Sequence, residues 1–264
     1  MVQLHGVGFS YLRQQQKIPV VKDLSLELET NKSYALLGRS GCGKTTLLYL
    51  LAQILTPNQG SIEWDYSESG VKPVIGFVTQ TSSLFPWKTA LDNVILGLSF
   101  RKDVTAHEKK HRAMQILDAL GLVQLSHRYP RQLSGGQAQR VSLARTLVAE
   151  PEFLLMDEPT SQLDEMTREE VQETIRKVQC SHPRTLVFVT HSVEEAVYLG
   201  EHVLVMDQGT ITSIIGNDSF GLENPRVHQK FYHVCSNVRD VLQPTSQSSS
   251  PMGFGTVPRG AFNG

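Results

Sequence analysis

One eight-residue segment constrains the fold more than any other part of the chain: Gly38-Arg39-Ser40-Gly41-Cys42-Gly43-Lys44-Thr45. It fits the phosphate-loop pattern G-x-x-x-x-G-K-[ST] with every fixed position filled. The apolar run Tyr34 to Leu37 precedes it, and good helix formers follow it from Thr46 to Ile54. This order of strand, glycine loop and helix predicts an α/β core, because the glycines let backbone N–H groups point at a bound phosphate.

The side chains of the loop indicate how a nucleotide is held. Lys44 is expected to reach the terminal phosphates, and the Thr45 hydroxyl is expected to ligate Mg²⁺. We therefore predict ATP and Mg²⁺ as cofactors, with these nucleotide contacts: Gly38, Arg39, Ser40, Gly41, Cys42, Gly43, Lys44, Thr45 and Thr46. Cys42 has two interpretations, a small filler of the loop or a thiol whose alkylation blocks ATP binding.

A second segment that can carry chemistry is Phe153-Leu154-Leu155-Met156-Asp157-Glu158, an apolar strand that ends in two carboxylates. Asp157 suits a Mg²⁺ ion held through its water shell, and Glu158 could take the proton of an attacking water. An acidic pair after a strand is more often the solvated start of a loop. The phosphate loop upstream favours the functional interpretation.

Hydrophobic patterning predicts how the rest of the chain is organised. Leu24, Leu26 and Leu28 repeat at period two, as in a half-buried antiparallel strand. We predict one nucleotide-binding domain over 1–242, an α/β P-loop NTPase core with a small antiparallel β subdomain and a helical insertion at about 81–150. A docked amphipathic helix should bury Val227, Phe231, Val234, Val238 and Val241. Residues 243–264 are rich in Ser, Pro and Gly, which predicts a disordered tail.

Composition narrows the class of partner and the compartment. The formal net charge is only −1 and no long basic run occurs, so nucleic acid is not an expected partner. Three widely spaced cysteines are an odd number, which is typical of reduced cytosolic thiols. No signal-peptide layout and no bilayer-spanning apolar stretch is found, so any membrane work should be done through a partner.

The segment His107-Glu108-Lys109-Lys110-His111 fits the zinc-protease pattern H-E-x-x-H, with both histidines on one helical face. We reject this interpretation, because the stretch is lysine-rich, no third ligand is identifiable, and a nucleotide site already explains the chain.

Another motif distinguishes this sequence from phosphate-loop proteins in general. The segment Leu133-Ser134-Gly135-Gly136-Gln137-Ala138-Gln139-Arg140 resembles the signature motif of the ATP-binding cassette family. Further family motifs follow in the family's order: an adenine-stacking aromatic at Tyr11, a glutamine loop at Gln80, a dimer loop at Ser161-Gln162-Leu163-Asp164, and a switch histidine at His191. The resemblance covers about Val2 to Gly216. Gln162 departs from the alanine usual in the family, which leaves Asp164 in place.

The resemblance implies further roles for residues of this chain. Gln80 and His191 join Lys44 and Glu158 as catalytic residues, and Gln80 joins Thr45 and Asp157 as a ligand of Mg²⁺. The nucleotide contacts then extend to Tyr11, Gln80, Ser134, Gly135, Gly136, Gln137 and Asp164. The signature motif begins a predicted helix, Gln137 to Val148, whose N-terminal N–H groups can hold a second anion. In the family, this surface completes the ATP site of a second copy packed head to tail.

The stretch from Leu84 to Val94 resembles importers of the nitrate, sulfonate and taurine type. There it meets transmembrane permease subunits, so we expect a permease contact near Gln80 to Asp92 and an indirect link to a substrate-binding protein. Phe85, Pro86 and Trp87 are either local core or an interface. These features predict a peripheral subunit on the cytoplasmic face of the inner membrane. The alternative is a non-transport cassette ATPase of DNA repair, translation or cluster assembly.

Overall fold

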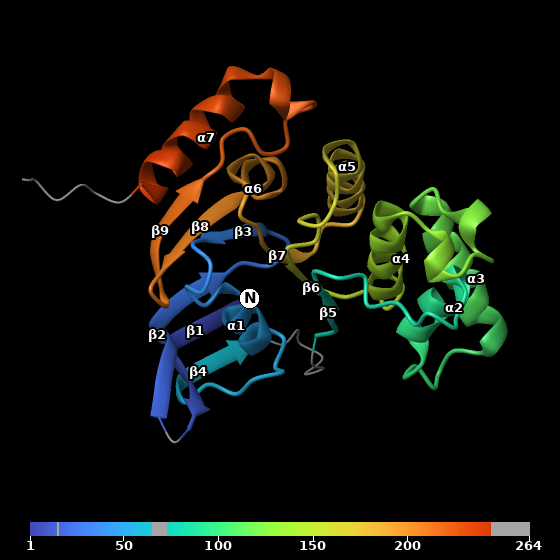
Figure 1. The fold of residues 1–264 in the computed structure, drawn as a ribbon, viewed down its shortest axis with the longest axis horizontal. Helices are drawn as coiled ribbons and strands as arrows, with labels where there is room; N and C mark the ends of the chain where they lie inside the picture. Colours follow the sequence, from blue (N-terminus) through green and yellow to red (C-terminus); the bar gives the residue numbers. More distant parts are fainter. Residues whose placement is uncertain (15, 65–72, 244–264) are drawn as a thin grey trace, which may run out of the picture.

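The structure is a computed structural model, and it describes residues 1–14, 16–64 and 73–243. Two sheets and a set of helices make up the chain (Figure 1). The smaller sheet is antiparallel, with the strand order β2-β1-β4, and consists of β1 (Val2–Arg13), β2 (Gln16–Leu28) and β4 (Gln59–Trp64). It carries the period-two pattern predicted from the sequence, since Leu24, Leu26 and Leu28 are all buried on β2.

The larger sheet has six strands in the order β5-β6-β7-β3-β8-β9. All neighbours are parallel except the last pair. Their bounds are β3 (Ser33–Gly38), β5 (Ile75–Val78), β6 (Phe153–Asp157), β7 (Thr185–Val189), β8 (His202–Asp207) and β9 (Thr210–Gly216). The β8–β9 hairpin turns at Gln208 and Gly209, both at positive φ, as in the primed turns that match the twist of a hairpin.

The apolar strands β6 and β7 separate two hydrophobic cores. Leu155, Val187 and Val189 point toward α1 (Lys44–Leu51) and the antiparallel sheet. Leu154 and Phe188 point the other way, toward the helices on the opposite face. Because side chains of a strand alternate between its faces, burial on both sides requires the continuous apolar runs that the sequence shows.

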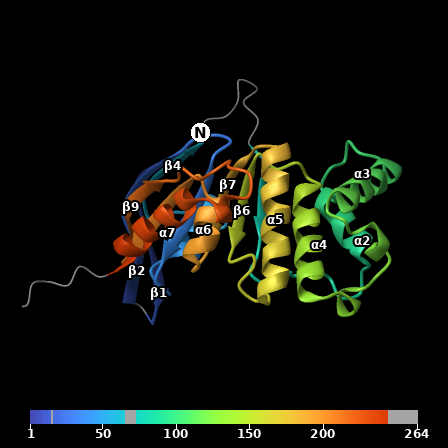
Figure 2. The ribbon, with the colours of Figure 1, turned by 90° about the horizontal axis from the view of Figure 1, so that it is seen from above.

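Helices form the remainder of the chain. Between residues 81 and 150 every element is helical, namely α2 (Ala90–Ile95), η1 (Leu96–Leu98), α3 (Ala106–Ala119), η2 (Val123–Leu125), η3 (Pro130–Gln132) and α4 (Gly135–Leu147). These helices form a lobe beside the central sheet, and α4 packs against α5 (Glu165–Ser181) (Figure 2). Within the described ranges, none of the helices combines the length and the apolar composition needed to cross a membrane.

The C-terminal part confirms the predicted amphipathic helix only in part. Phe231, Val234 and Val238 of α7 (Gln229–Leu242) are buried against α6 (Val193–Leu199) and the β8 strand. Val227 is 76% exposed because it lies in the short η4 turn (Pro225–Val227), before the helix begins. Val241 is 42% exposed in the last turn. The prediction was therefore wrong for these two valines, and the predicted tail lies outside the described residues from 244 onward.

Candidate nucleotide site

The phosphate loop joins the end of β3 to the start of α1, as the sequence predicts. Gly43 is the N-cap of α1 at φ 112°, a conformation that side chains with a Cβ rarely adopt. A Cβ on Gly43 would also lie 2.8 Å from the Val20 carbonyl oxygen, and one on Gly38 would lie 2.2 Å from the Met206 carbonyl oxygen. Space therefore requires glycine at both positions, and the backbone conformation requires it at Gly43 as well. A glycine loop of this kind lets backbone N–H groups face an anion.

Lys44 folds back over its own loop. Its ammonium donates to the carbonyl oxygens of Gly38 at 2.8 Å and Arg39 at 2.9 Å. Both partners are neutral, so the positive charge stays available to a phosphate at the mouth of the loop.

Cys42 lies beneath the loop. Its thiol sulfur is 4.0 Å from the Lys44 ammonium, and the side chain is buried in the core that contains Leu47 and Met206. Burial raises the pKa of the thiol, with the Lys44 charge opposing the shift. The small-filler interpretation describes this packing, and access by a reagent requires the loop to open.

The two residues predicted to hold Mg²⁺ are neighbours in space. The Thr45 hydroxyl donates to the Asp157 carboxylate at 3.3 Å across the ends of α1 and β6. Burial raises the pKa of Asp157, the Glu158 charge adds to the rise, and Thr45 and Lys44 oppose it. A poorly solvated carboxylate next to a hydroxyl is an all-oxygen set of the kind that a hard cation prefers. Thr45 and Asp157 therefore fit Mg²⁺, whereas the hydrogen bonds of Gln80 in the structure go to Glu158 and Ser161.

Three of the four predicted catalytic side chains, those of Gln80, Glu158 and His191, come together beyond the carboxyl ends of β5, β6 and β7. Gln80 donates its amide N–H to the Glu158 carboxylate at 3.2 Å and to the Ser161 hydroxyl at 3.2 Å. His191 Nδ1 lies 3.7 Å from the Glu158 carboxylate. Glu158 itself is at φ 45°, and its N–H donates to the Val189 carbonyl oxygen at 3.1 Å. This left-handed backbone is the kind of local strain that concentrates at functional sites.

Two members of this arrangement had no individual role in the sequence analysis. Ser161 was named only as part of a loop, and its hydroxyl donates to the Glu158 carbonyl oxygen at 3.1 Å. Glu195 has no predicted role, yet it is a buried carboxylate, and its partners Thr160 and Thr190 adjoin Ser161 and His191. The available signal was its position at the third residue of a helix that begins two residues after His191, where the Ser192 hydroxyl caps the Glu195 N–H at 3.2 Å.

Tyr11, a residue of β1, lies beside the first turn of α1. Its hydroxyl is 3.3 Å from the Thr46 hydroxyl, its ring contacts Phe9 edge-on at 4.9 Å between centroids, and 42% of the side chain is exposed. An exposed aromatic beside the phosphate loop has the place that an adenine-stacking residue needs.

The signature residues form the N-terminus of α4. Ser134 is the N-cap, its hydroxyl accepts from the Gln137 N–H at 3.3 Å, and Gln137 accepts in return from the Ser134 N–H at 3.0 Å. The helix begins at Gly135, two residues earlier than predicted. A Cβ on Gly136 would lie 2.1 Å from the Thr167 methyl carbon of α5, so this glycine is required where the two helices meet.

Asp164 begins the neighbouring helix. It is the N-cap of α5, its carboxylate accepts from the Thr167 N–H at 3.0 Å, and this hydrogen bond lowers the pKa of Asp164.

The signature helix is linked to the glutamine loop rather than to the phosphate loop. Gln139 of α4 donates to the Thr79 carbonyl oxygen at 3.4 Å, and Arg145 donates to the Ser83 carbonyl oxygen at 2.9 Å. Figure 1 shows α1 and α4 in different lobes, with β5 and β6 of the central sheet between them. One chain thus carries two surfaces suited to an anion, and only one of them includes Lys44.

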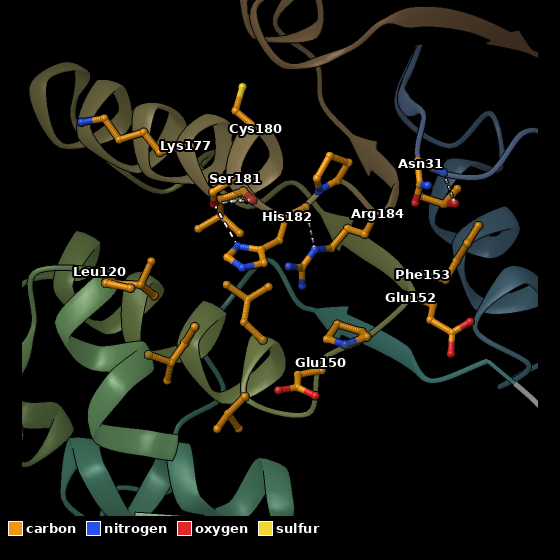
Figure 3. A pocket seen from close by; sticks show the side chains of 18 of the residues that line it. Asn31, Leu120, Glu150, Glu152, Phe153, Lys177, Cys180, Ser181, His182 and Arg184 are labelled. Carbon is orange, nitrogen blue, oxygen red and sulfur yellow. Dashed lines mark hydrogen bonds between the residues drawn. The ribbon is translucent and has the colours of Figure 1, made fainter. Parts of the chain in front are cut away.

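A wide cavity lies at the opposite edge of the central sheet (Figure 3). Phe153, at the start of β6, and His182 and Arg184, just before β7, line it. Because the nucleotide residues lie at the other ends of these strands, the cavity is separate from the predicted site.

The histidines of the rejected zinc pattern lie on α3. Glu108, between them in sequence, pairs with Arg112 at 2.6 Å instead. Across the described parts of the chain, no group of three or more His, Cys, Asp or Glu side chains could hold a metal ion.

A mostly parallel sheet with a phosphate loop after β3, and a carboxylate pair at the end of β6, which β7 separates from β3, defines a P-loop ATPase. The family model described as ABC transporter matches residues 21–161, more than half of the chain. The chain therefore belongs to the ABC transporter family, and within it to the ATP-binding cassettes.

Relatives and solved structures place the chain within this family. It is 42% identical over 203 residues to the taurine import ATP-binding protein of Pseudomonas aeruginosa, covering 76% of this chain and 77% of the relative. It is 42% identical over 205 residues to a sulfate/thiosulfate import ATP-binding protein of Rhizobium meliloti, covering 75% of this chain but 56% of that relative. A dimeric ATP-binding cassette solved in a post-hydrolysis state with ADP and Pi matches with TM-score 0.72 and 30% identity, over 83% of this chain and 100% of the other.

Cysteine labelling tests the position of Cys42. With N-ethylmaleimide at neutral pH, the exposed Cys180 should react at least about tenfold faster than Cys42, because burial raises the pKa of the Cys42 thiol. ATP should slow the reaction of Cys42 and leave that of Cys180 unchanged, as followed by peptide mass spectrometry. Protein fully modified at Cys42 should no longer bind ATP, and retained binding would contradict a site at this loop.

Gly136→Ala tests the contact between α4 and α5. The added methyl should destabilise the fold by about 1–3 kcal/mol through its clash with Thr167, measured as a shift of the urea unfolding midpoint. Thr167→Ser removes the clashing methyl, so the double variant should recover most of the loss. Gly135→Ala is the matched control, since its Cβ meets only the far end of Leu163 at 3.3 Å. A double variant no more stable than Gly136→Ala would show that this contact is not the cause.

Proposed function

We propose that this chain is the ATP-hydrolysing, energy-coupling subunit of an ABC importer for a small anionic or organic solute, of the nitrate, sulfonate and taurine type. The observation that carries the proposal is the convergence of Glu158, Gln80 and His191 at the strand ends beside the Lys44 loop. The printed names of the relatives, taurine import and sulfate/thiosulfate import ATP-binding proteins, support the subtype.

The proposed reaction is attack of water on the γ-phosphate of ATP. Glu158 takes the proton of that water, and Gln80 and Ser161 hold the carboxylate and its backbone in place through the hydrogen bonds described above. Lys44 and the N–H groups of its loop neutralise the phosphate oxygens. His191 contacts the γ-phosphate. Mg²⁺, when bound by Thr45, Asp157 and Gln80, supplies positive charge next to the phosphates.

The active form proposed here is a head-to-tail homodimer. Ser134, Gly135, Gly136 and Gln137 supply the N-terminus of α4, a helix of 13 residues, to the ATP held by the Lys44 loop of the second copy. The placement of α1 and α4 in different lobes supports this division of labour (Figure 1). We propose that residues 1–242 form one domain that binds and hydrolyses ATP. The insertion at about 81–150 is the lobe that moves together with the permease.

The permease contact is proposed at the loop that follows Gln80. Phe85 and Trp87 are 42% and 69% exposed and contact each other edge-on at 5.3 Å between ring centroids. The loop is held from beneath by the fully buried Asn93, which accepts from the Phe85 N–H at 2.8 Å and donates to the carbonyl oxygens of Lys88 and Thr89. A rigid, exposed aromatic pair favours an interface over local core and a transporter over the non-transport alternative. Contact with a permease places the subunit on the cytoplasmic face of the inner membrane.

Glu158→Gln tests the proposed general base. The amide cannot accept the proton of water, so steady-state phosphate release should fall by about a hundredfold or more. ATP binding should persist and the ATP-bound dimer should become easier to isolate by size-exclusion chromatography. Glu63→Gln is the matched control, at an exposed residue of β4. A Glu158→Gln variant that hydrolyses at the normal rate would refute the assigned role.

Trp87→Ala tests the proposed permease contact. Affinity for membranes that contain the cognate permease should fall by about tenfold or more, because the exposed aromatic anchor that the permease would cover is lost, while the ATPase rate of the isolated chain stays unchanged. Co-sedimentation with permease-containing vesicles measures this. Ile214→Ala, an exposed apolar residue of β9, serves as the control. Equal binding by both variants would place the interface elsewhere.

A further inference from the structure

A buried carboxylate lies behind the candidate catalytic cluster. Only 4% of Glu195 is exposed, and its two oxygens accept three side-chain hydrogen bonds. The Thr160 hydroxyl and the Gln172 amide, the latter at 3.1 Å, donate to Oε1, and the Thr190 hydroxyl donates to Oε2. All three donors are themselves buried. A buried charge is retained only where such partners replace its solvation, so this network has one well-defined arrangement.

Two of these partners adjoin the residues of the candidate site. Thr160 precedes Ser161, which bonds to the Glu158 carbonyl oxygen and to Gln80. Thr190 precedes His191. The two threonines leave β6 and β7 at the same edge of the sheet, so one carboxylate joins the backbone segments that carry Ser161 and His191.

Hydrogen bonds to a carboxylate are shorter and stronger than hydrogen bonds between neutral groups. Loops beyond strand ends are otherwise the most mobile parts of a fold. The Glu195 network therefore restricts both loops where an error of about 1 Å would separate His191 from the phosphate and the 160–164 loop from its neighbours.

We infer that Glu195 is a positioning residue for ATP hydrolysis, which holds His191 and the 160–164 loop in register with Glu158. This inference rests on the roles proposed above for Glu158 and His191. Glu195 acts through Thr160 and Thr190 and makes no contact with the reacting atoms in the proposed reaction.

The network also extends to the C-terminal part of the chain. Gln172 donates to Glu195 through its amide nitrogen, and its amide oxygen accepts from the Arg226 guanidinium. Arg226 lies over the Tyr198 ring at 4.1 Å and pairs with Glu169 at 3.0 Å. Arg226 thereby fixes which end of the Gln172 amide faces Glu195, and the η4 turn supports the positioning carboxylate.

The first test compares Thr190→Val with Thr190→Ser in the full chain. Valine keeps the branched shape and removes the hydroxyl, so kcat for ATP should fall about tenfold while KM stays within about twofold. Serine keeps the hydroxyl, so kcat should stay within about twofold of wild type. Thr174→Val on α5 is the matched control, because the Thr174 hydroxyl bonds only to the Glu170 carbonyl oxygen, outside the network.

The second test uses Glu195→Gln. Gln172 and Thr160 both donate to one carboxylate oxygen, so the new amide should present its oxygen to them and its nitrogen to Thr190. The Thr190 hydroxyl can then only accept from that nitrogen, so the charge-assisted hydrogen bond that it donated to the carboxylate is lost, as it is in Thr190→Val. The kcat of the double variant should therefore lie close to that of either single variant, rather than at the product of the two losses.

Wild type and Glu158→Gln are assayed in parallel, with thermal unfolding followed by circular dichroism for every variant. An active wild type and an inactive Glu158→Gln, together with a normal kcat per folded molecule in Thr190→Val and Glu195→Gln, would overturn the positioning role and leave the proposed function intact. Lower melting temperatures without a change in kcat would assign Glu195 to stability alone, which also overturns the inference. A wild type without ATPase activity would overturn the proposed function and the inference with it.

Discussion

The parallel pairing of β6, β7 and β3 is the constraint on which the rest of the molecule depends. In this register Val189 of β7 is opposite both Asp157 of β6 and Leu36 of β3, so the three strands end at one edge. A functional segment follows the end of each strand at this edge. The phosphate loop follows β3, the Asp157-Glu158 pair ends β6, and His191 follows β7. Because parallel strands need apolar residues on both faces, the same runs that build the two cores also align the site.

Much of this arrangement could be predicted from the sequence, because it depends on the residue types of short, continuous segments. The phosphate loop is a short segment whose residue types dictate its backbone, and the acidic pair directly follows a continuous apolar run. Family resemblance then supplied Gln80 and His191, which no local pattern identifies. Their proximity to Glu158 becomes visible only in three dimensions, since the three residues are separated by tens of positions in sequence.

What escaped prediction depends on tertiary contacts. A glutamate in the first turn of a short helix is an ordinary helix-start residue, and nothing in the sequence shows that Thr160, Gln172 and Thr190 surround Glu195. The apolar spacing of the last helix likewise includes Val227 and Val241, which the actual helix start and the final turn leave exposed. Periodicity identifies a helix face but not the length over which a neighbour covers it.

Gly136 has a consequence for the interpretation of related chains. Its missing side chain admits the Thr167 methyl of α5, so the residue serves the contact between two helices as well as the N-terminus of α4. Selection for folding alone would retain such a glycine in a cassette that had ceased to hydrolyse ATP. A signature motif that is intact at this position is therefore a sign of preserved architecture, and catalytic competence has to be judged from residues such as Glu158, whose carboxylate faces Gln80 and His191.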